Sequence, residues 1–319
     1  MMNKSLFEVT STEAEQTLIA ALRGWLDGKS WGEVRKLVRA RRVLVNGALS
    51  LDEARKLTAG ERVEIAAQPQ APPPTDEDVL VRHADPDLIV VEKPAGMTTL
   101  RHAAERRWPE ARKLLQPTLD EGVVRLLARA EAPRHKHLAR QKRPRVRAVQ
   151  RLDRDTSGLL VFARSPAAEQ GLIEQFSRHT VERVYHAVVV GHPVAQRIET
   201  RLVRDRGDGL RGSTPDPTAG KPAITHIRPL EPLGDYSLIE CRLETGRTHQ
   251  IRIHLSELGH PVCGDAKYGG DDRSQAPRLA LHAAALGFVH PSTGERLHFE
   301  MSWPSDLQKF VARLRRGAG

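Results

Sequence analysis

Apolar positions with a helical repeat dominate the start of the chain. Leu18 and Leu22 fall on one face of a helix that Ser11 or Thr12 can cap and that Gly28 can end. Trp25 and Leu26 fall on the same face and extend it, as in a helix with one buried side. We therefore expect a first amphipathic helix here.

A capping box predicts where a second helix begins. Ser30 and Glu33 have the required spacing, and apolar residues with a helical repeat follow them. Residues 43–45 and 62–65 are short runs typical of strands, and Asn46-Gly47 is a strong turn signal. The pattern predicts a small helix-helix-hairpin domain.

A proline-rich stretch separates this small domain from the rest of the chain. Residues 68–78 contain Pro69 and three consecutive prolines from Pro72, a composition typical of a semi-rigid linker. We therefore expect a small domain in residues 1–67 and a large domain in residues 79–319.

Strand and helix patterns alternate in the large domain. The expected strands lie at residues 88–91, 159–163, 184–190 and 236–243, and the expected helices at 166–178, 250–258 and 307–316. Residues 100–147 differ, because they carry basic clusters and few apolar repeats. We interpret them as a basic insert with too little apolar surface to be fully ordered without RNA.

The balance of charge indicates an acidic partner. The chain has 50 Lys and Arg against 40 Asp and Glu, a net charge of +10, and a pI near 10.0. The basic residues are bunched at Arg35, Lys36, Arg39, Arg41 and Arg42, and again at Arg143, Arg145, Arg147 and Arg151. Because acids do not alternate with them, we predict that these residues bind RNA. A merely basic, solvated surface is the alternative that composition leaves open.

The remaining composition argues against membranes, export and metals. No apolar run is long enough to cross a bilayer, no signal-peptide core is present, and the two cysteines provide no disulfide framework. His135 and His137 lack nearby acidic or cysteine ligands, and packing explains His249 and His254 better than a metal does. We expect a cytoplasmic protein without a metal site or a membrane partner.

Three polar segments beside predicted strands or turns could carry chemistry: residues 151–158, 183–185 and 245–252. Asp153 is their candidate nucleophile or base. Tyr185 has a ring for stacking and a hydroxyl for proton transfer, and Arg252 can pair with a carboxylate. From the residues alone, an ordinary ion pair in a loop explains Asp153 at least as well.

Four ordered motifs carry a family resemblance. The stretches "LIVVEKPAGM", "QRLDRDTSGLLVFARS", "RVYHAVVVG" and "TGRTHQIRIHLSELGHPVCGDAKYG" resemble those of the RluA-type pseudouridine synthases. The resemblance implies an α+β fold, with a large mixed, mainly antiparallel sheet flanked by helices. It also implies isomerisation of uridine in RNA without a cofactor. The front segment "SWGEVRKLVRARRVLVNGALSLDEARKLTAGERVEI" resembles a small RNA-binding domain shared by a ribosomal protein and RNA-modifying enzymes.

The resemblance also implies roles for single residues. Asp153 falls on the family's catalytic aspartate, Tyr185 on the tyrosine that stacks on uracil and can take the carbon-5 proton, and Arg252 on the arginine that pairs with the aspartate. Arg151 matches an arginine that occupies the space of the flipped nucleotide. One departure is plain, since Gln150 stands where the family has histidine.

These inferences predict a monomeric RNA pseudouridine synthase, with ribosomal RNA of the large subunit favoured over transfer RNA as the substrate. Lys93 and Pro94 are expected to be structural turn residues, and Thr156 to Gly158 to form the loop that aims Asp153. The alternative, motivated by Gln150 and the basic insert, is a non-catalytic RNA-binding or ribosome-assembly factor on the same fold.

Overall fold

The structure is a computed structural model that describes residues 5–131, 144–269 and 273–317 of the chain. The chain divides into two compact units, Met1–Pro74 with His102–Pro117 and Thr75–Arg101 with Thr118–Gly319. The grouping of His102–Pro117 with the first unit was not apparent from the sequence. The linker at residues 68–78 stays a prediction.

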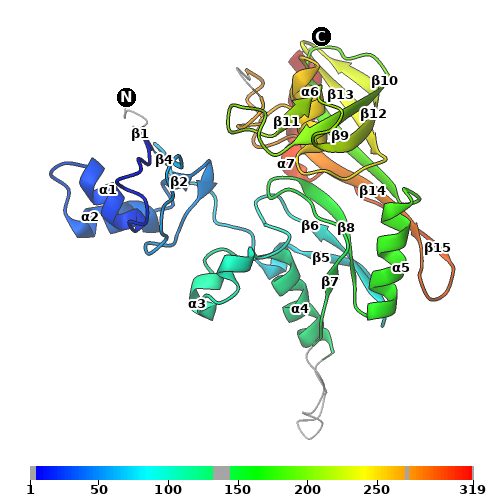
Figure 1. The fold of residues 1–319 in the computed structure, drawn as a ribbon, viewed down its shortest axis with the longest axis horizontal. Helices are drawn as coiled ribbons and strands as arrows, with labels where there is room; N and C mark the ends of the chain where they lie inside the picture. The colour runs from blue at the N-terminus through cyan, green and yellow to red at the C-terminus, as the bar shows by residue number, and fades with distance from the viewer. Residues whose placement is uncertain (1–4, 132–143, 270–272, 318–319) are drawn as a thin grey trace, which may run out of the picture. The chain divides into compact units, whose positions relative to one another are not determined.

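A 4-stranded antiparallel sheet and two helices form the first unit (Figure 1). In spatial order the strands are β1 (Ser5–Glu8), β4 (Arg62–Ile65), β2 (Val43–Val45) and β3 (Ala48–Leu49). The helices are α1 (Leu18–Trp25) and α2 (Trp31–Arg39), with the short η2 (Ala103–Glu105) and α3 (Glu110–Lys113) later in the chain. Buried aliphatic side chains from both helices and the sheet form one core.

The predicted capping box and hairpin turn are confirmed. Ser30 and Glu33 exchange hydrogen bonds at the start of α2, and Asn46 and Gly47 both have positive φ, as a tight hairpin turn requires. The predicted start of α1 is wrong, because Thr17 caps this helix. Residues 11–15, before this helix, form turns instead, and Glu13 accepts hydrogen bonds from Thr10 there.

An 11-stranded sheet organises the second unit. Its order is β11-β10-β12-β13-β9-β14-β8-β6-β5, with β15 beside β14 and β7 beside β8. The strands are β5 (Leu80–Ala84), β6 (Leu88–Lys93), β7 (Arg147–Ala148), β8 (Ser157–Ala163), β9 (Glu182–Val190), β10 (Gln196–Val203), β11 (Gly212–Thr214), β12 (Lys221–Leu233), β13 (Tyr236–Leu243), β14 (Leu281–Val289) and β15 (Arg296–Glu300). Within the described strands, β8 and β14 pair in parallel and the other pairs are antiparallel.

Helices flank this sheet. They are η1 (Asp76–Asp78), α4 (Leu119–Ala130), α5 (Pro166–Ser177), α6 (Gln250–Glu257) and α7 (Ser305–Gly317). Apolar residues of α4, α6 and α7 join the main core, and those of α5 join a second cluster with β6 and β8. The prediction of an α+β fold with a large mixed, mainly antiparallel sheet is confirmed.

The interpretation of residues 100–147 needs correction. Leu119, Val123 and Leu127 follow a helical repeat and are buried in the main core as part of α4. The apolar sequence here is therefore sufficient to pack a helix, contrary to the expectation of too little apolar surface. Partial mobility of the basic insert without RNA stays a prediction. The most basic part of that stretch, residues 132–143, lies outside the described residues.

The strand β14 lies between β9 and β8 and joins the two parts of the sheet (Figure 1). It approaches β8 closely at Gly158, whose φ is +126°; a Cβ there would lie 2.3 Å from the carbonyl oxygen of Ala283. Only glycine fits this position without strain. The residue that ends the Asp153 loop is thereby fixed against a strand from the far end of the chain.

Candidate active site

The loop that carries Asp153 is anchored on both sides. Leu152 is held by Thr99, whose hydroxyl donates to the Leu152 carbonyl at 2.7 Å and accepts from the Leu152 N–H at 3.1 Å. Beyond Asp153, the Thr156 N–H donates to the Asp153 carbonyl at 3.2 Å. These bonds close a turn directly before β8, so the Asp153 side chain projects from a fixed backbone.

Lys93 ties this loop to the end of β6. Its side chain is fully buried, and its Nζ atom donates to the carbonyls of Pro94 at 3.0 Å, Met97 at 2.8 Å and Arg154 at 2.8 Å. Burial lowers the pKa of Lys93 to about 7. Three carbonyl acceptors match the three donors of an ammonium group. Lys93 therefore acts across a long sequence separation and is more than a residue of a local turn.

Arg252 brings a positive charge to Asp153. Its Nη1 atom lies 3.5 Å from Asp153 Oδ2, and its Nε and Nη2 atoms donate to the two oxygens of Asp265 at 2.6 and 2.7 Å. Burial opposes the charge, but the bonds to Asp265 raise the pKa of Arg252 above its ordinary value. Asp265 also accepts from the N–H groups of Lys267 and Tyr268. Arg252 is thus fixed from behind and faces Asp153 with its remaining nitrogen.

His249 stands on the other side of the Asp153 carboxylate. Its Nε2 atom lies 4.0 Å from Asp153 Oδ1, and its Nδ1 atom is 2.9 Å from the Tyr268 hydroxyl. Residue 249 precedes α6 with a φ of 60°, which turns the ring toward the carboxylate loop. Burial lowers the pKa of His249 to about 4, so the imidazole is neutral at neutral pH.

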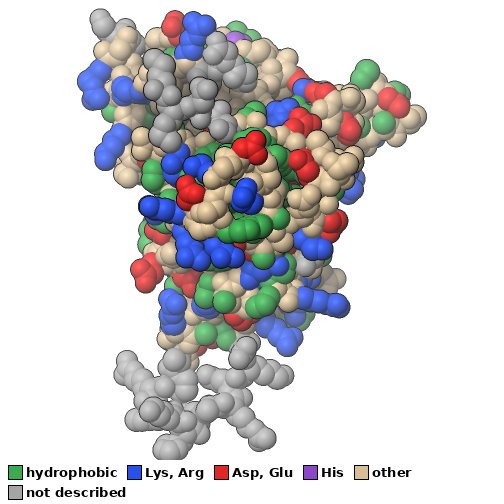
Figure 2. Space-filling view, turned by 90° about the vertical axis from the view of Figure 1, so that its left-hand side faces the viewer, with side chains coloured by type: hydrophobic (Ala, Val, Ile, Leu, Met, Phe, Trp, Pro, Cys, Tyr) green, Lys and Arg blue, Asp and Glu red, His purple; other side chains and the backbone are tan. Residues whose placement is uncertain are grey.

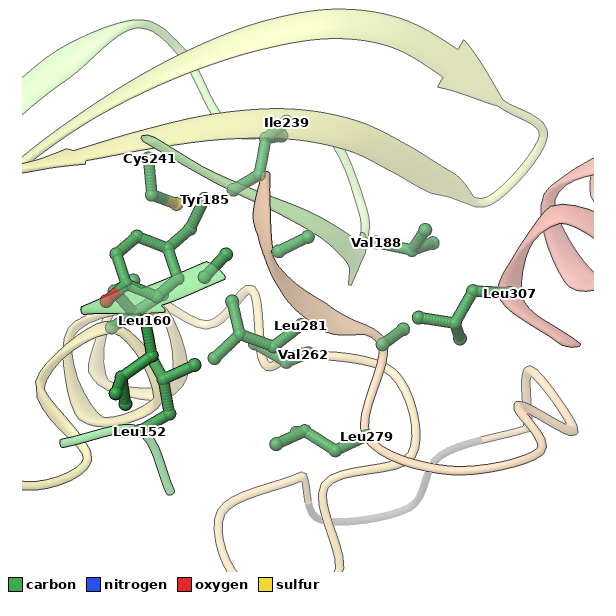
Figure 3. Packing of buried hydrophobic residues seen from close by; sticks show 14 of the residues in the cluster. Leu152, Leu160, Tyr185, Val188, Ile239, Cys241, Val262, Leu279, Leu281 and Leu307 are labelled. Carbon is green, nitrogen blue, oxygen red and sulfur yellow. The ribbon is translucent and has the colours of Figure 1, made fainter. Parts of the chain in front are cut away.

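Tyr185 lies on β9 and is 8% exposed. Its ring belongs to the main core, beside Leu160 and Leu152 (Figure 3). Burial raises the pKa of the Tyr185 phenol to about 12. The hydroxyl is therefore protonated at neutral pH, and Tyr185 lines the pocket described next.

Asp153, Tyr185 and Arg252 line one pocket of about 790 Å³ in the second unit. Arg151 lines it too and is exposed. Gln250 holds its rim: its side-chain oxygen accepts from the Thr245 hydroxyl and the Arg247 N–H, and its nitrogen donates to the Ile224 carbonyl. The structure thus brings together the three predicted catalytic residues and Arg151.

The predicted RNA-binding residues of the first unit differ in their exposure and in the partners that their side chains have. Arg35 and Arg39 share Glu53 at 3.2 and 3.1 Å, and Arg42 donates to the Ala66 carbonyl. Lys36 is exposed, and Arg41 is half-buried with a φ of 58°. On one face of the molecule, Lys and Arg side chains are interspersed with Asp and Glu (Figure 2). Glu53 therefore lies closer to Arg35 and Arg39 in space than in sequence.

The second predicted basic group is only partly described. Arg145 is exposed, whereas Arg147 is half-buried and lies 3.5 Å from Glu169. Arg143 lies outside the described residues. Their contact with RNA stays a prediction.

Sequence reasoning missed the residues that support Asp153: Asp265, Tyr268 and His249. Asp265 and Tyr268 stand in the quoted stretch "PVCGDAKYG", and His249 stands directly before α6, so the signal was present in the motif. Their roles depend on how the chain after α6 folds back on Arg252. No cluster of His, Cys, Asp and Glu that could hold a metal ion occurs among the described residues.

Comparison with known proteins defines the class of protein. A model of the RNA pseudouridylate synthase family matches residues 87–257. The chain is 37% identical to the ribosomal large subunit pseudouridine synthase D of Zymomonas mobilis subsp. mobilis over 280 residues, 84% of each chain. The chain belongs to the RNA pseudouridine synthases, which are isomerases that act on RNA.

Further relatives and a solved structure agree with this class. An uncharacterized RNA pseudouridine synthase of Bacillus subtilis is 36% identical over 292 residues, 89% of each chain. The human RNA pseudouridylate synthase domain containing 4 has the same fold, with a TM-score of 0.57 at 22% identity over 74% of this chain and 92% of that one. No helix in the described part of the chain is long and apolar enough to span a membrane.

Proposed function

We propose that the protein isomerises specific uridines in large-subunit ribosomal RNA to pseudouridine, with Asp153 as the catalytic group. The printed names of several relatives, such as the ribosomal large subunit pseudouridine synthase D of Zymomonas mobilis subsp. mobilis, support this substrate. The observation that carries the assignment of Asp153 is its position in the pocket, with Arg252 at 3.5 Å and Tyr185 in the same wall. The expected monomeric state and cytoplasmic location remain predictions.

The reaction rearranges one bond and conserves all atoms. The bond between ribose C1′ and uracil N1 breaks, the base turns, and C1′ bonds to C5; C5 then gives up its proton, and N1 ends with one. Asp153 serves either as the nucleophile at the sugar or as the base that removes a sugar proton during cleavage. Both steps need an anionic, directed carboxylate, which Arg252 and the neutral His249 flank.

Tyr185 is better suited to stack on the displaced uracil than to remove a proton from it. At a pKa of about 12 the phenolate is only about 1 part in 100,000 at pH 7. The ring is held in the core and cannot turn away, so it offers a fixed platform for the base. Arg151, exposed at the pocket, fits the role of filling the space left by the extruded nucleotide.

The first unit is proposed to hold RNA outside the pocket. Of the predicted contacts outside the pocket, Lys36 is exposed in the first unit and Arg145 is exposed in the second. Phosphate contacts of this kind position the substrate without reading its sequence. The non-catalytic alternative has less support, because Asp153, Tyr185 and Arg252 line one pocket in spite of Gln150.

The test compares Asp153→Asn with Asp155→Asn. Asp155 lies on the same loop but pairs with Arg154 and does not line the pocket, which makes it a matched control. Purified proteins are incubated with deproteinised large-subunit ribosomal RNA and, separately, with bulk transfer RNA from cells that lack the protein. Pseudouridine is then mapped by carbodiimide labelling.

We expect Asp153→Asn to abolish conversion in ribosomal RNA and Asp155→Asn to retain most of it. RNA affinity should stay close to wild type in both variants, because neither change removes a cation. Substantial residual activity of Asp153→Asn would refute its catalytic role. Conversion of transfer RNA alone would refute the proposed substrate.

A further inference from the structure

The side-chain amide of Gln150 is a polar group in the pocket that the proposed chemistry does not use. Gln150 lines the pocket, yet its Nε2 atom is shielded from solvent and has no hydrogen-bond partner among the described residues. Buried amide groups almost always have a partner in a native structure, so an unpaired one calls for an explanation, and a ligand bound in the pocket would provide one.

An apolar shelf adjoins Gln150. It consists of Val149, Ile173 and Phe176, which all line the same pocket. Val149 and Phe176 pack on the apolar cluster shared by α5 and β8, whereas the Ile173 side chain is 49% exposed. A rigid apolar surface that opens into a polar pocket suits the flat face of a nucleobase.

The shelf lies next to the place for the target uracil and is distinct from it. Arg183 precedes Tyr185 by two residues on β9, so both side chains leave the same face of the strand about 7 Å apart. The guanidinium carbon of Arg183 lies 5.5 Å from the centre of the Phe176 ring. Arg183 therefore lies near Phe176 of the shelf and on the same strand face as Tyr185. The pocket of about 790 Å³ is in the upper range for small-ligand sites and has room for more than one pyrimidine base.

We propose that Gln150 and this shelf bind the nucleobase that flanks the target uridine in the RNA strand. When the base binds, the Gln150 side chain turns so that Nε2, which the protein covers in this structure, donates a hydrogen bond to an acceptor on the edge of that base, and Ile173 contacts its face. A glutamine amide presents a donor and an acceptor side by side, a pattern that reads base edges. Gln150 is thus a specificity-determining residue. The inference rests on the proposed function, because the target uridine defines which base is the neighbour.

The test uses transcripts that carry the uridine modified by the wild-type protein. Each neighbour of that uridine is changed in turn to the other three bases, and kcat/KM is measured for the wild-type protein, Gln150→Ala and Gln150→Glu. The wild-type protein should discriminate at one neighbouring position by between about 5-fold and about 140-fold. Both variants should reduce this preference to within about threefold while still converting the best transcript.

Two further variants separate a base contact from a general effect. Ile173→Ala should raise KM on every transcript with little change in kcat, because it removes contact with the face of the base. Gln170→Ala is the matched control, since Gln170 is exposed on α5 and does not line the pocket. It should leave both the rate and the preference unchanged.

The outcomes are distinct. An unchanged preference in Gln150→Ala and Gln150→Glu would overturn the subsite and leave the proposed function intact. A uniform loss on all transcripts, with the preference between them unchanged, would overturn it as well, because it would indicate a phosphate contact that does not read the base. If the wild-type protein made no pseudouridine on any RNA, the proposed function would fail, and the subsite would fall with it.

Discussion

The buried pair of Arg252 and Asp265 should determine both the stability of the second unit and the direction of Arg252. The two side chains share two hydrogen bonds of 2.6 and 2.7 Å and are 9% and 0% exposed. At a charge separation of about 4 Å and an effective dielectric constant of about 20, their attraction is about 4 kcal/mol. Removing one partner of such a buried pair typically costs about 3–5 kcal/mol, because the other charge stays buried.

We therefore expect Arg252→Met to lower the free energy of unfolding of the second unit by about 3–5 kcal/mol. Asp265→Asn should cost less, about 2–3 kcal/mol, since Asp153 remains 3.5 Å from Arg252 and partly compensates its charge. The double variant Arg252→Met/Asp265→Asn should be more stable than the sum of the single changes predicts, because neither charge is left alone.

Urea unfolding followed by circular dichroism measures these differences. The matched control is Glu231→Gln, which breaks an equally short two-bond pair with Arg315 on the surface. That pair is largely exposed and should contribute less than about 1 kcal/mol. In Asp265→Asn a displaced Arg252 should also reduce kcat by about 100-fold. Strictly additive changes, or single losses below about 1 kcal/mol, would refute this view of the pair.

Two other predictions concern stability. His254 and His282 are fully buried, and burial lowers the pKa of each to about 4. Because the folded state resists their protonation, their contribution is complete above the unfolded pKa of about 6.5 and is lost as the pH falls toward 4, by up to about 3 kcal/mol each. Urea midpoints measured from pH 7 to pH 4.5 should fall, and less steeply in His254→Asn; a flat profile would contradict this. Gly158→Ala should destabilise the second unit by more than about 3 kcal/mol, because a Cβ meets the backbone of Ala283 on top of the strained φ. Thermal melting of this variant equal to wild type would show that β8 and β14 can separate there at little cost.

Local sequence signals predicted the elements that depend on contacts between residues close together in the chain. The capping box of Ser30 and Glu33 and the apolar alternation of β13 are complete within a few residues, so they could be found without the fold. The bounds of α4 were not predicted, because basic clusters on either side of this helix dominate residues 100–147. The long strand β12 was missed because Pro222 and Pro229 argue against a strand in a sheet interior.

The candidate site shows the same difference between local signals, which can be predicted, and contacts between distant residues, which cannot. Its motifs were visible in the sequence, but the support of Asp153 depends on atoms far away along the chain. Arg252 meets Asp153 across 99 residues, and Lys93 meets the Arg154 carbonyl across 61. Such pairings follow from the order of strands in the sheet, which apolar periodicity does not encode.

The position of β14 has a consequence for the time at which the enzyme becomes active during synthesis. Asp153, Tyr185 and Arg252 all precede Leu281, the first residue of β14, so a ribosome releases them before the strand that separates β9 from β8. Chains usually fold as they emerge, in domain-sized units. A nascent chain that stops before residue 281 thus holds every proposed catalytic residue but lacks the strand that joins β9 to β8 and fixes Gly158. Activity should switch on abruptly once residues 281–289 have emerged and β14 has paired with β9 and β8.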